Sequence, residues 1–177
     1  RLARVRLVQL PAAPSDRVPG PGEAPASQRV DATAMPFLDT GIALGHANKG
    51  VEGLAHDRAR NRLYAAVEQR PRRVLRVDLE TGQTEDLFDA EAAFAGTCAT
   101  DLSGLAFREA SRDLVVVSQE GRCLVRASLD GRVLEAVPVG GDRPEGVAFS
   151  EDLAEMVVAS EPNELLRYVR EPGLIDG

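Results

Sequence analysis

The stretch VEGLAHDRARNRLYAAVEQRP, from Val51 to Pro71, decides the fold because two versions of it recur further along the chain. Its counterparts are DLSGLAFREASRDLVVVSQEGR, residues 101–122, and PEGVAFSEDLAEMVVASEPNE, residues 144–164. Gly53, Gly104 and Gly146 align, so the repeat spacing is 51 and then 42 residues. Each unit holds two short apolar runs on either side of a turn. Repeats of this length and content are typical of the four-stranded blades of a β-propeller.

The remainder of each unit has the pattern of a third and a fourth strand. RRVLRVDLETGQTEDLF, residues 72–88, alternates like a strand, turns at Glu80–Gly82 and continues as a second strand. CLVRASLDGRVLEAVPV, residues 123–139, does the same around Asp130–Gly131, a strong hairpin signal. The sequence therefore predicts an all-β chain of four-stranded antiparallel blades, at about residues 48–95, 96–140 and 141–177.

Residues 1–47 are expected to form part of a preceding blade together with a loop. Ala3–Leu10 reads as a strand, and Pro11–Gln28 is rich in Pro, Gly, Ala and Ser, as long loops are. Three blades are too few to close a ring, which usually needs ~4–8, and an open ring leaves sheet edges unprotected. We therefore expect about three blades of a longer, five- or six-bladed propeller, with an oligomer that completes the ring as the alternative.

Composition excludes several classes of partner. The net charge of −7 and the pI near 4.9 do not suit a nucleic-acid surface, which must neutralise phosphates. Aromatic residues make up 4% of the chain, so stacking platforms for bases are scarce. No apolar run approaches the ~20 residues of a membrane span. The two cysteines, Cys98 and Cys123, fit either a disulfide, if the compartment is oxidising, or two buried thiols.

Carboxylates recur at fixed positions beside the predicted strands. In a propeller the first strand of each blade lines the central channel, so a residue just ahead of it lies at one channel mouth. Antiparallel return brings the end of the second strand to the same mouth. The candidates collected in this way are Glu52, Glu68, Asp101, Glu120 (one position late, at an expected β-bulge), Glu145, Glu161 and Asn163.

Two interpretations of these side chains stay open. Oxygen donors without imidazole or thiolate favour a hard cation, so the first is a Ca²⁺ site. The second is structural: each glutamate accepts hydrogen bonds from backbone N–H groups of the next blade and fixes the register between blades. The recurrence of one glutamate in each blade favours the second interpretation.

The three signatures together resemble the SdiA-regulated (YjiK-like) family of bacterial β-propeller proteins. The resemblance covers about residues 48–170 and is most specific in Ser160–Asn163 followed by Tyr168; the turn at Ser150–Glu155 departs from it because it lacks the usual glycine. It implies an envelope protein, on the periplasmic face, with a membrane anchor outside this chain. It establishes no activity, although related propellers include calcium-dependent phytases and lactonases.

Two functions follow as hypotheses. The first is a non-enzymatic, envelope-associated module that binds a small molecule or a protein, or acts as a scaffold, and is monomeric at full length. The alternative is a Ca²⁺-dependent hydrolase of phosphate esters or lactones at the carboxylate-lined mouth. The predicted site lacks His and Lys, which such hydrolases use for proton transfer and phosphate binding, so the first hypothesis is preferred.

Overall fold

The structure is a computed structural model that describes residues 2–6, 37–43, 50–68 and 70–170. The Pro-rich loop predicted at Pro11–Gln28 lies outside the described residues. Thirteen strands are described: β1 (Leu2–Arg6), β2 (Phe37–Ala43), β3 (Val51–Asp57), β4 (Arg62–Val67), β5 (Arg73–Asp78), β6 (Thr84–Asp89), β7 (Gly104–Arg108), β8 (Asp113–Ser118), β9 (Cys123–Ser128), β10 (Val133–Pro138), β11 (Arg143–Phe149), β12 (Glu155–Glu161) and β13 (Glu164–Val169). A one-turn helix, α1 (Ala90–Ala93), follows β6. The all-β prediction is confirmed.

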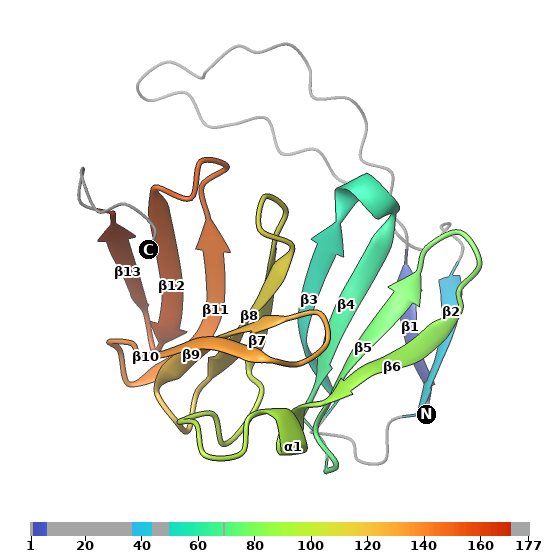
Figure 1. Cartoon of the computed structure of the whole chain (residues 1–177), viewed down its shortest axis with the longest axis horizontal. Helices are drawn as coiled ribbons and strands as arrows, with labels where there is room; N and C mark the ends of the chain where they lie inside the picture. The colour runs from blue at the N-terminus through green and yellow to red at the C-terminus, as the bar shows by residue number, and fades with distance from the viewer. Residues whose placement is uncertain (1, 7–36, 44–49, 69, 171–177) are drawn as a thin grey trace.

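The strands form antiparallel sheets in chain order. We call β3–β6 the first sheet, β7–β10 the second and β11–β13 the third; β1 and β2 pair in a separate two-stranded sheet. Each of the three sheets lies within one of the predicted segments. Figure 1 shows them side by side as in a fan, from β1–β2 on the right to β13 on the left. The strand β2 was not predicted, and residues 7–10 of the strand predicted at Ala3–Leu10 are outside the described part of the chain.

Neighbouring sheets pack through apolar side chains that alternate along the second and third strands. Ala66 and Val74 of the first sheet are fully buried in a cluster that includes Leu114 and Val116 of the second. The opposite face of the second sheet buries Val115 and Val117 against the third sheet, around Val158. Both faces of the second sheet are therefore covered, which explains the fully buried run of β8.

The innermost strands approach each other closely where the repeats carry glycine. A Cβ on Gly53 would lie 2.7 Å from the Cβ of Leu105, and a Cβ on Gly104 would lie 2.3 Å from the backbone oxygen of Glu145. These contacts leave no room for a side chain. The glycines at the head of the repeat thus set the separation of β3, β7 and β11, whose sheets contact one another in that order.

Turns follow the predicted chemistry with one instructive exception. Gly82 and Gly131 adopt positive φ at the hairpins predicted around them. The turn at Ser150–Glu155 lacks glycine, and Leu153 takes the left-handed conformation at φ 56° instead. Asp152 supports this turn, since its Oδ1 accepts hydrogen bonds from Ser150 Oγ at 2.6 Å and from Ala154 N at 3.0 Å.

The two cysteines form a disulfide within the second sheet's repeat. Cys98, in the segment that leads to β7, bonds to Cys123 at the start of β9, with the Cα atoms 6.3 Å apart. Of the alternatives that the sequence left open, the structure contains the disulfide. It fastens the segment before β7, which carries Asp101, to the sheet behind it.

Candidate functional site

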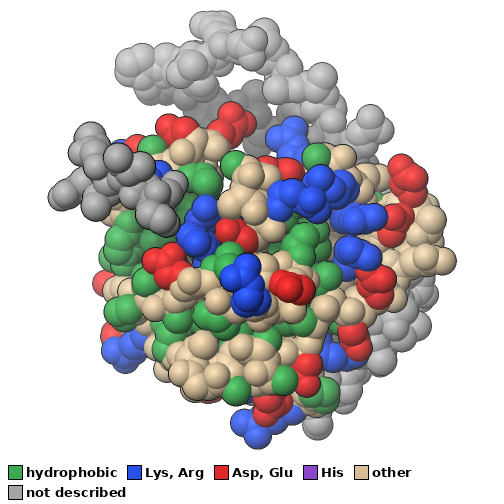
Figure 2. Space-filling view, in the orientation of Figure 1, with side chains coloured by type: hydrophobic (Ala, Val, Ile, Leu, Met, Phe, Trp, Pro, Cys, Tyr) green, Lys and Arg blue, Asp and Glu red, His purple; other side chains and the backbone are tan. Residues whose placement is uncertain are grey.

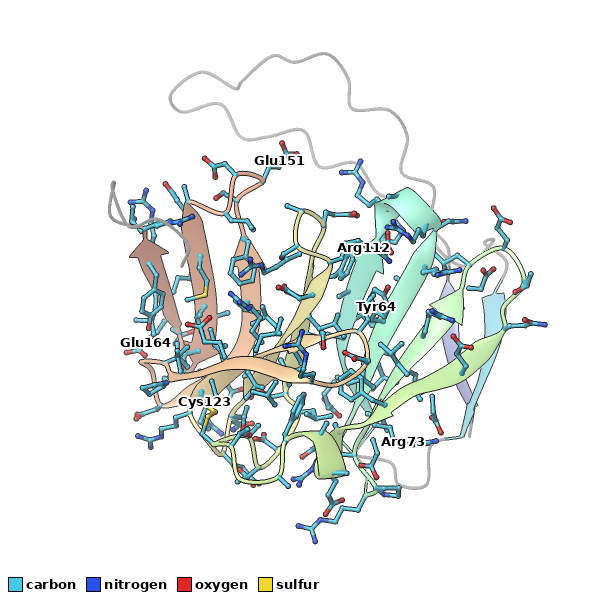
Figure 3. All side chains as sticks on the ribbon, viewed as in Figure 1. Tyr64, Arg73, Arg112, Cys123, Glu151 and Glu164 are labelled. Atoms are coloured by element: carbon cyan, nitrogen blue, oxygen red, sulfur yellow. A yellow bond between two sulfur atoms is a disulfide. The ribbon has the colours of Figure 1, made fainter. Side chains whose placement is uncertain are left out.

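The predicted channel mouth lies at the end of the molecule where the inner strands begin. In Figure 3, Cys123 lies toward this end, and Glu151, in the turn after β11, lies at the opposite one. Register shifts in the first and third sheets fall between Val51 and Gly53 and between Pro144 and Gly146. Glu52 and Glu145 are therefore the extra residues of β-bulges, a geometry that redirects a side chain out of the regular alternation.

Glu120 does not occupy the bulge predicted for it. The bulges lie at Glu52 and Glu145, whereas Glu120 is exposed in the turn between β8 and β9. That turn is closed by Arg122 in the left-handed conformation at φ 49°. In the repeat alignment Glu120 is one position later than Glu68 and Glu161. This offset lies in the turn after β8, because no extra residue interrupts the pairing of β7 with β8.

Asp101 is committed to the same turn. Its carboxylate is buried, with the residue 6% exposed, and accepts hydrogen bonds from Glu120 N at 3.1 Å, from Gln119 N at 3.2 Å and from Ser118 Oγ. Backbone donors to a buried carboxylate offset its loss of hydration. These donors belong to the same repeat as Asp101; the donors expected from the next blade were predicted for the glutamates.

The link between the second and third sheets at this mouth comes from a serine. Ser103 Oγ lies 3.0 Å from the carbonyl oxygen of Pro144 in the next sheet and 3.2 Å from that of Val117 in its own. A hydroxyl placed between two backbone acceptors has a structural role. This contact depends on the approach of β7 to β11, which no local sequence pattern reports.

Glu161 has a partner that the sequence reading missed. Arg143 pairs with Glu161 across the β11–β12 ladder, and its guanidinium lies 2.6 Å from Glu161 Oε2. Both side chains are about half exposed, so the pair adds at most about 1 kcal/mol to stability. Glu145 makes no such pair with the described residues, and Glu52 Oε1 accepts a hydrogen bond from Gly50 N at 3.1 Å.

The pKa of Glu145 is raised by its surroundings at the mouth. Partial desolvation, followed by the nearby carboxylate of Glu161, raises the pKa of Glu145; Arg143 opposes this, and Glu52 and Asp101 add to it. A raised folded-state pKa means that ionisation of Glu145 opposes folding. Its favourable contribution to stability is present below the unfolded-state pKa and is lost as the pH rises through the folded-state pKa.

The two remaining candidate residues, Glu68 and Asn163, lie just after β4 and in the turn after β12. Glu68 follows β4 and is half-buried, and its backbone N–H donates to Gly50 O at 3.1 Å. Asn163 is exposed in the turn between β12 and β13. Within the described residues no group of three or more His, Cys, Asp or Glu side chains has the geometry to hold a metal ion. The Ca²⁺ site predicted from these residues stays a prediction.

The inner strands also line a cavity of about 550 Å³ toward the end of the molecule opposite the mouth. Its wall is apolar along Leu54, Ala106 and Ala148, and charged side chains, Glu109 among them, lie at the far end. There, Glu109 Oε1 accepts a hydrogen bond of 2.7 Å from the N–H of Arg58, in the turn between β3 and β4. The predicted contact ran from a mouth glutamate to the next blade, whereas this contact links a different glutamate, at the opposite end, to the preceding blade.

The family model described as SdiA-regulated matches residues 24–169. No curated protein matches. No helix among the described residues is long and apolar enough to cross a membrane.

Solved structures resemble the chain in fold. A nidogen/laminin complex matches with 16% identity and a TM-score of 0.54, over 68% of this chain and 48% of that chain. Hydrazine synthase of Kuenenia stuttgartiensis matches with 17% identity and a TM-score of 0.50, over 68% and 33%. Regucalcin of Agrobacterium tumefaciens, described as a calcium-binding protein, matches with 17% identity and a TM-score of 0.52, over 70% and 40%.

The chain therefore spans between a third and a half of the chains that it resembles. At these identities the likeness concerns the fold alone, and the fold is that of a β-propeller. The propeller prediction is confirmed, while the prediction of five or six blades stays a prediction.

Proposed function

The chain belongs to the SdiA-regulated family, and we infer that it serves as a non-enzymatic binding module of the bacterial cell envelope. The observation that carries this inference is the gathering of carboxylates from two sheets at one mouth, where partial desolvation, and after it the repulsion of the neighbouring carboxylates, raises the pKa of Glu145. A ligand with a cationic group relieves that repulsion. The ligand we propose is therefore a small molecule or a protein segment that presents a basic group.

The structural roles of the other candidates support a binding module over an enzyme. Asp101 uses its oxygens to close a turn, Ser103 bridges two backbone carbonyls, and Glu161 pairs with Arg143. A hydrolase needs a positioned base and a stabiliser for the developing charge. Asp101, Ser103 and Glu161 are instead engaged in structural contacts.

We place the protein on the periplasmic face of the envelope, held there by an anchor outside this chain, as a monomer at full length. The Cys98–Cys123 disulfide supports an oxidising compartment, because such bonds persist outside the reducing cytosol. A net charge of −7 is consistent with a protein that does not bind nucleic acid.

A Ca²⁺-dependent hydrolase of phosphate esters or lactones is the second candidate. Its support is the fold likeness to a regucalcin that is described as calcium-binding, together with the oxygen donors at the mouth. Glu52 and Glu145 are the side chains that such an ion would need most, since they are the bulge carboxylates at the mouth, whereas Asp101 and Glu161 are held by a turn and by Arg143.

Calorimetric titration separates the two candidates. We expect a tri-lysine peptide to bind in a salt-sensitive manner, and Glu145→Gln and Glu52→Gln each to weaken binding about threefold, as the loss of one exposed charge contact predicts. Glu80→Gln, at an exposed turn of the first sheet, is the matched control and should bind as the wild type does. We expect no saturable heat with calcium chloride.

Saturable calcium binding that disappears in both mouth variants, together with calcium-dependent hydrolysis of a phosphate ester, would overturn the binding-module proposal in favour of the hydrolase. Equal peptide affinity in the wild type and in both mouth variants would show that the mouth is not the binding site.

A further inference from the structure

A second cavity lies between the second and third sheets, at the end of the molecule opposite the mouth. Its volume is about 300 Å³, at the lower end of the range for ligand pockets. The second sheet contributes Arg108 and Arg126 to its lining, and the third sheet contributes Phe149, Met156 and Tyr168. Figure 2 shows Lys and Arg side chains beside hydrophobic ones on the face toward the viewer, in the area where Figure 1 places β11 and the second sheet. The cavity thus has both cationic and apolar walls.

The repeat explains why this space is open. Tyr64 pairs with Ala55 in the first sheet and Val115 pairs with Ala106 in the second, so Val115 stands at the position equivalent to Tyr64. Tyr64 is 1% exposed, and its ring centroid lies 5.1 Å from that of Phe107 in the next sheet. Valine is too short to make this contact. The second interface between sheets therefore lacks the aromatic ring that fills the first, although protein interiors are close-packed.

One buried carboxylate holds two guanidinium groups at the wall of this cavity. The side chain of Asp113 is 4% exposed, with Oδ1 3.2 Å from Arg108 Nε and Oδ2 3.6 Å from Arg126 Nε. Arg108 Nε also donates a hydrogen bond to Ser111, and Arg126 makes a second ion pair of 3.3 Å with Glu135, which is exposed to solvent. An exposed ion pair compensates little charge. The two like charges therefore share Asp113 as their main partner.

The polar cluster is not saturated by its own members. The buried Arg126 Nε and the buried Asp113 Oδ1 have no hydrogen-bond partner among the described residues. The guanidinium of Arg108 lies over the ring of Phe149, with Cζ 5.8 Å from the ring centroid, and this contact leaves its in-plane N–H groups free to donate. Clusters with a purely structural role satisfy their buried polar atoms. An additional acceptor at this place would complete the cluster.

We propose that this cavity is a binding site for a small aromatic carboxylate. The carboxylate accepts hydrogen bonds from the terminal N–H groups of Arg108 and Arg126, since a planar guanidinium matches a carboxylate in shape and charge. The aromatic ring lies against Phe149 and Met156, in the space that a tyrosine fills between the first two sheets. The negative charge of the ligand compensates the guanidinium that Asp113 alone does not. The site is separate from the mouth, whose carboxylates repel such a ligand.

Equilibrium dialysis of the complete protein against 2-naphthoate tests the proposal. We expect saturable binding of 2-naphthoate. Its uncharged analogue 2-naphthamide has the same ring and nearly the same shape, and we expect it to bind at least roughly tenfold more weakly, because it lacks the charge-assisted hydrogen bonds. Equal affinity for the two probes would overturn the proposal, and so would the absence of saturable 2-naphthoate binding.

Removal of one guanidinium tests the assignment of the residues. Arg126→Gln leaves Asp113 paired with Arg108, so the variant should fold and bind 2-naphthoate roughly tenfold more weakly. Arg132→Gln, which removes an exposed arginine from the turn after β9, is the matched control and should bind as the wild type does. Wild-type affinity in Arg126→Gln would overturn the proposal.

Filling the cavity provides a test that leaves its charges in place and does not depend on the folding of Arg126→Gln. Ala154 is half-buried in the turn before β12 and lines the cavity. Ala154→Phe should occupy the space of the ligand ring and weaken 2-naphthoate binding at least roughly tenfold. Wild-type affinity in this variant would contradict a ligand in this cavity. Glu145→Gln, at the mouth, should leave the affinity unchanged; an altered affinity would place the probe at the mouth and overturn the proposal.

Discussion

Replacing Gly104 by alanine is expected to lower the free energy of unfolding by about 3 kcal/mol. The added Cβ would lie 2.3 Å from the backbone oxygen of Glu145 and 3.1 Å from a methyl group of Val117. The backbone oxygen cannot move aside as a flexible side chain can, so β7 and β11 must separate, and with them the two sheets that they carry. Overpacking of this kind costs ~1–3 kcal/mol, and more where the backbone resists. Denaturant unfolding followed by circular dichroism measures the change.

A second glycine separates steric conflict from backbone strain. Gly96 has φ +82° and nothing within 4 Å of its Cβ position, so Gly96→Ala should cost only ~1 kcal/mol, from strain alone. Gly53→Ala should instead resemble Gly104→Ala, because its Cβ would lie 2.7 Å from Leu105. If Gly104→Ala cost no more than Gly96→Ala, the close approach of the inner strands would be wrong.

Removal of the disulfide by Cys98→Ala with Cys123→Ala is expected to cost at least about 3.5 kcal/mol. The bond closes a loop with a sequence separation of 25 residues. A disulfide restricts the conformational entropy of the unfolded chain, which for a loop of this length destabilises the unfolded state by roughly 3.5 kcal/mol. The double variant loses this contribution. The native state loses in addition the fastening of the segment that carries Asp101. The measurement is the free energy of unfolding in urea for both proteins.

Reduction of the wild type provides the matched control. Dithiothreitol should bring the stability of the wild type down to that of the double variant and leave the variant unchanged. A variant within about 0.5 kcal/mol of the oxidised wild type would show that the bond contributes little, as engineered and strained bridges sometimes do.

Much of the fold was predictable because the apolar runs and turn residues that determine it are local in the sequence and recur in each repeat. The apolar runs that follow Gly53, Gly104 and Gly146 became the first two strands of three sheets, and Gly82 and Gly131 turned where the hairpin signals placed them. The strand β2 was missed, since it follows a segment that was predicted as a loop and has no counterpart in the repeat. The disulfide could only be left open, because a sequence does not state the compartment.

The candidate site was predicted less well, for a physical reason. The sequence could place Glu52, Glu145 and Glu161 at one mouth, but their partners depend on the exact pairing of strands and on turns. Arg143 reaches Glu161 through the cross-strand register, and that register shifts at the bulge. Asp101 serves a turn whose position is set by Ser118. Such contacts arise only once the backbone geometry is known.

If strands from different sheets bring carboxylates together at one channel mouth, titration of the Glu145 carboxyl group by carbon-13 NMR should show it. We expect the pKa of Glu145 to lie above the ordinary value of about 4.3, and to fall in Glu52→Gln, because that change removes a carboxylate that the first sheet brings to the mouth. A pKa at or below the ordinary value that does not move in Glu52→Gln would show that the first sheet brings no carboxylate near Glu145.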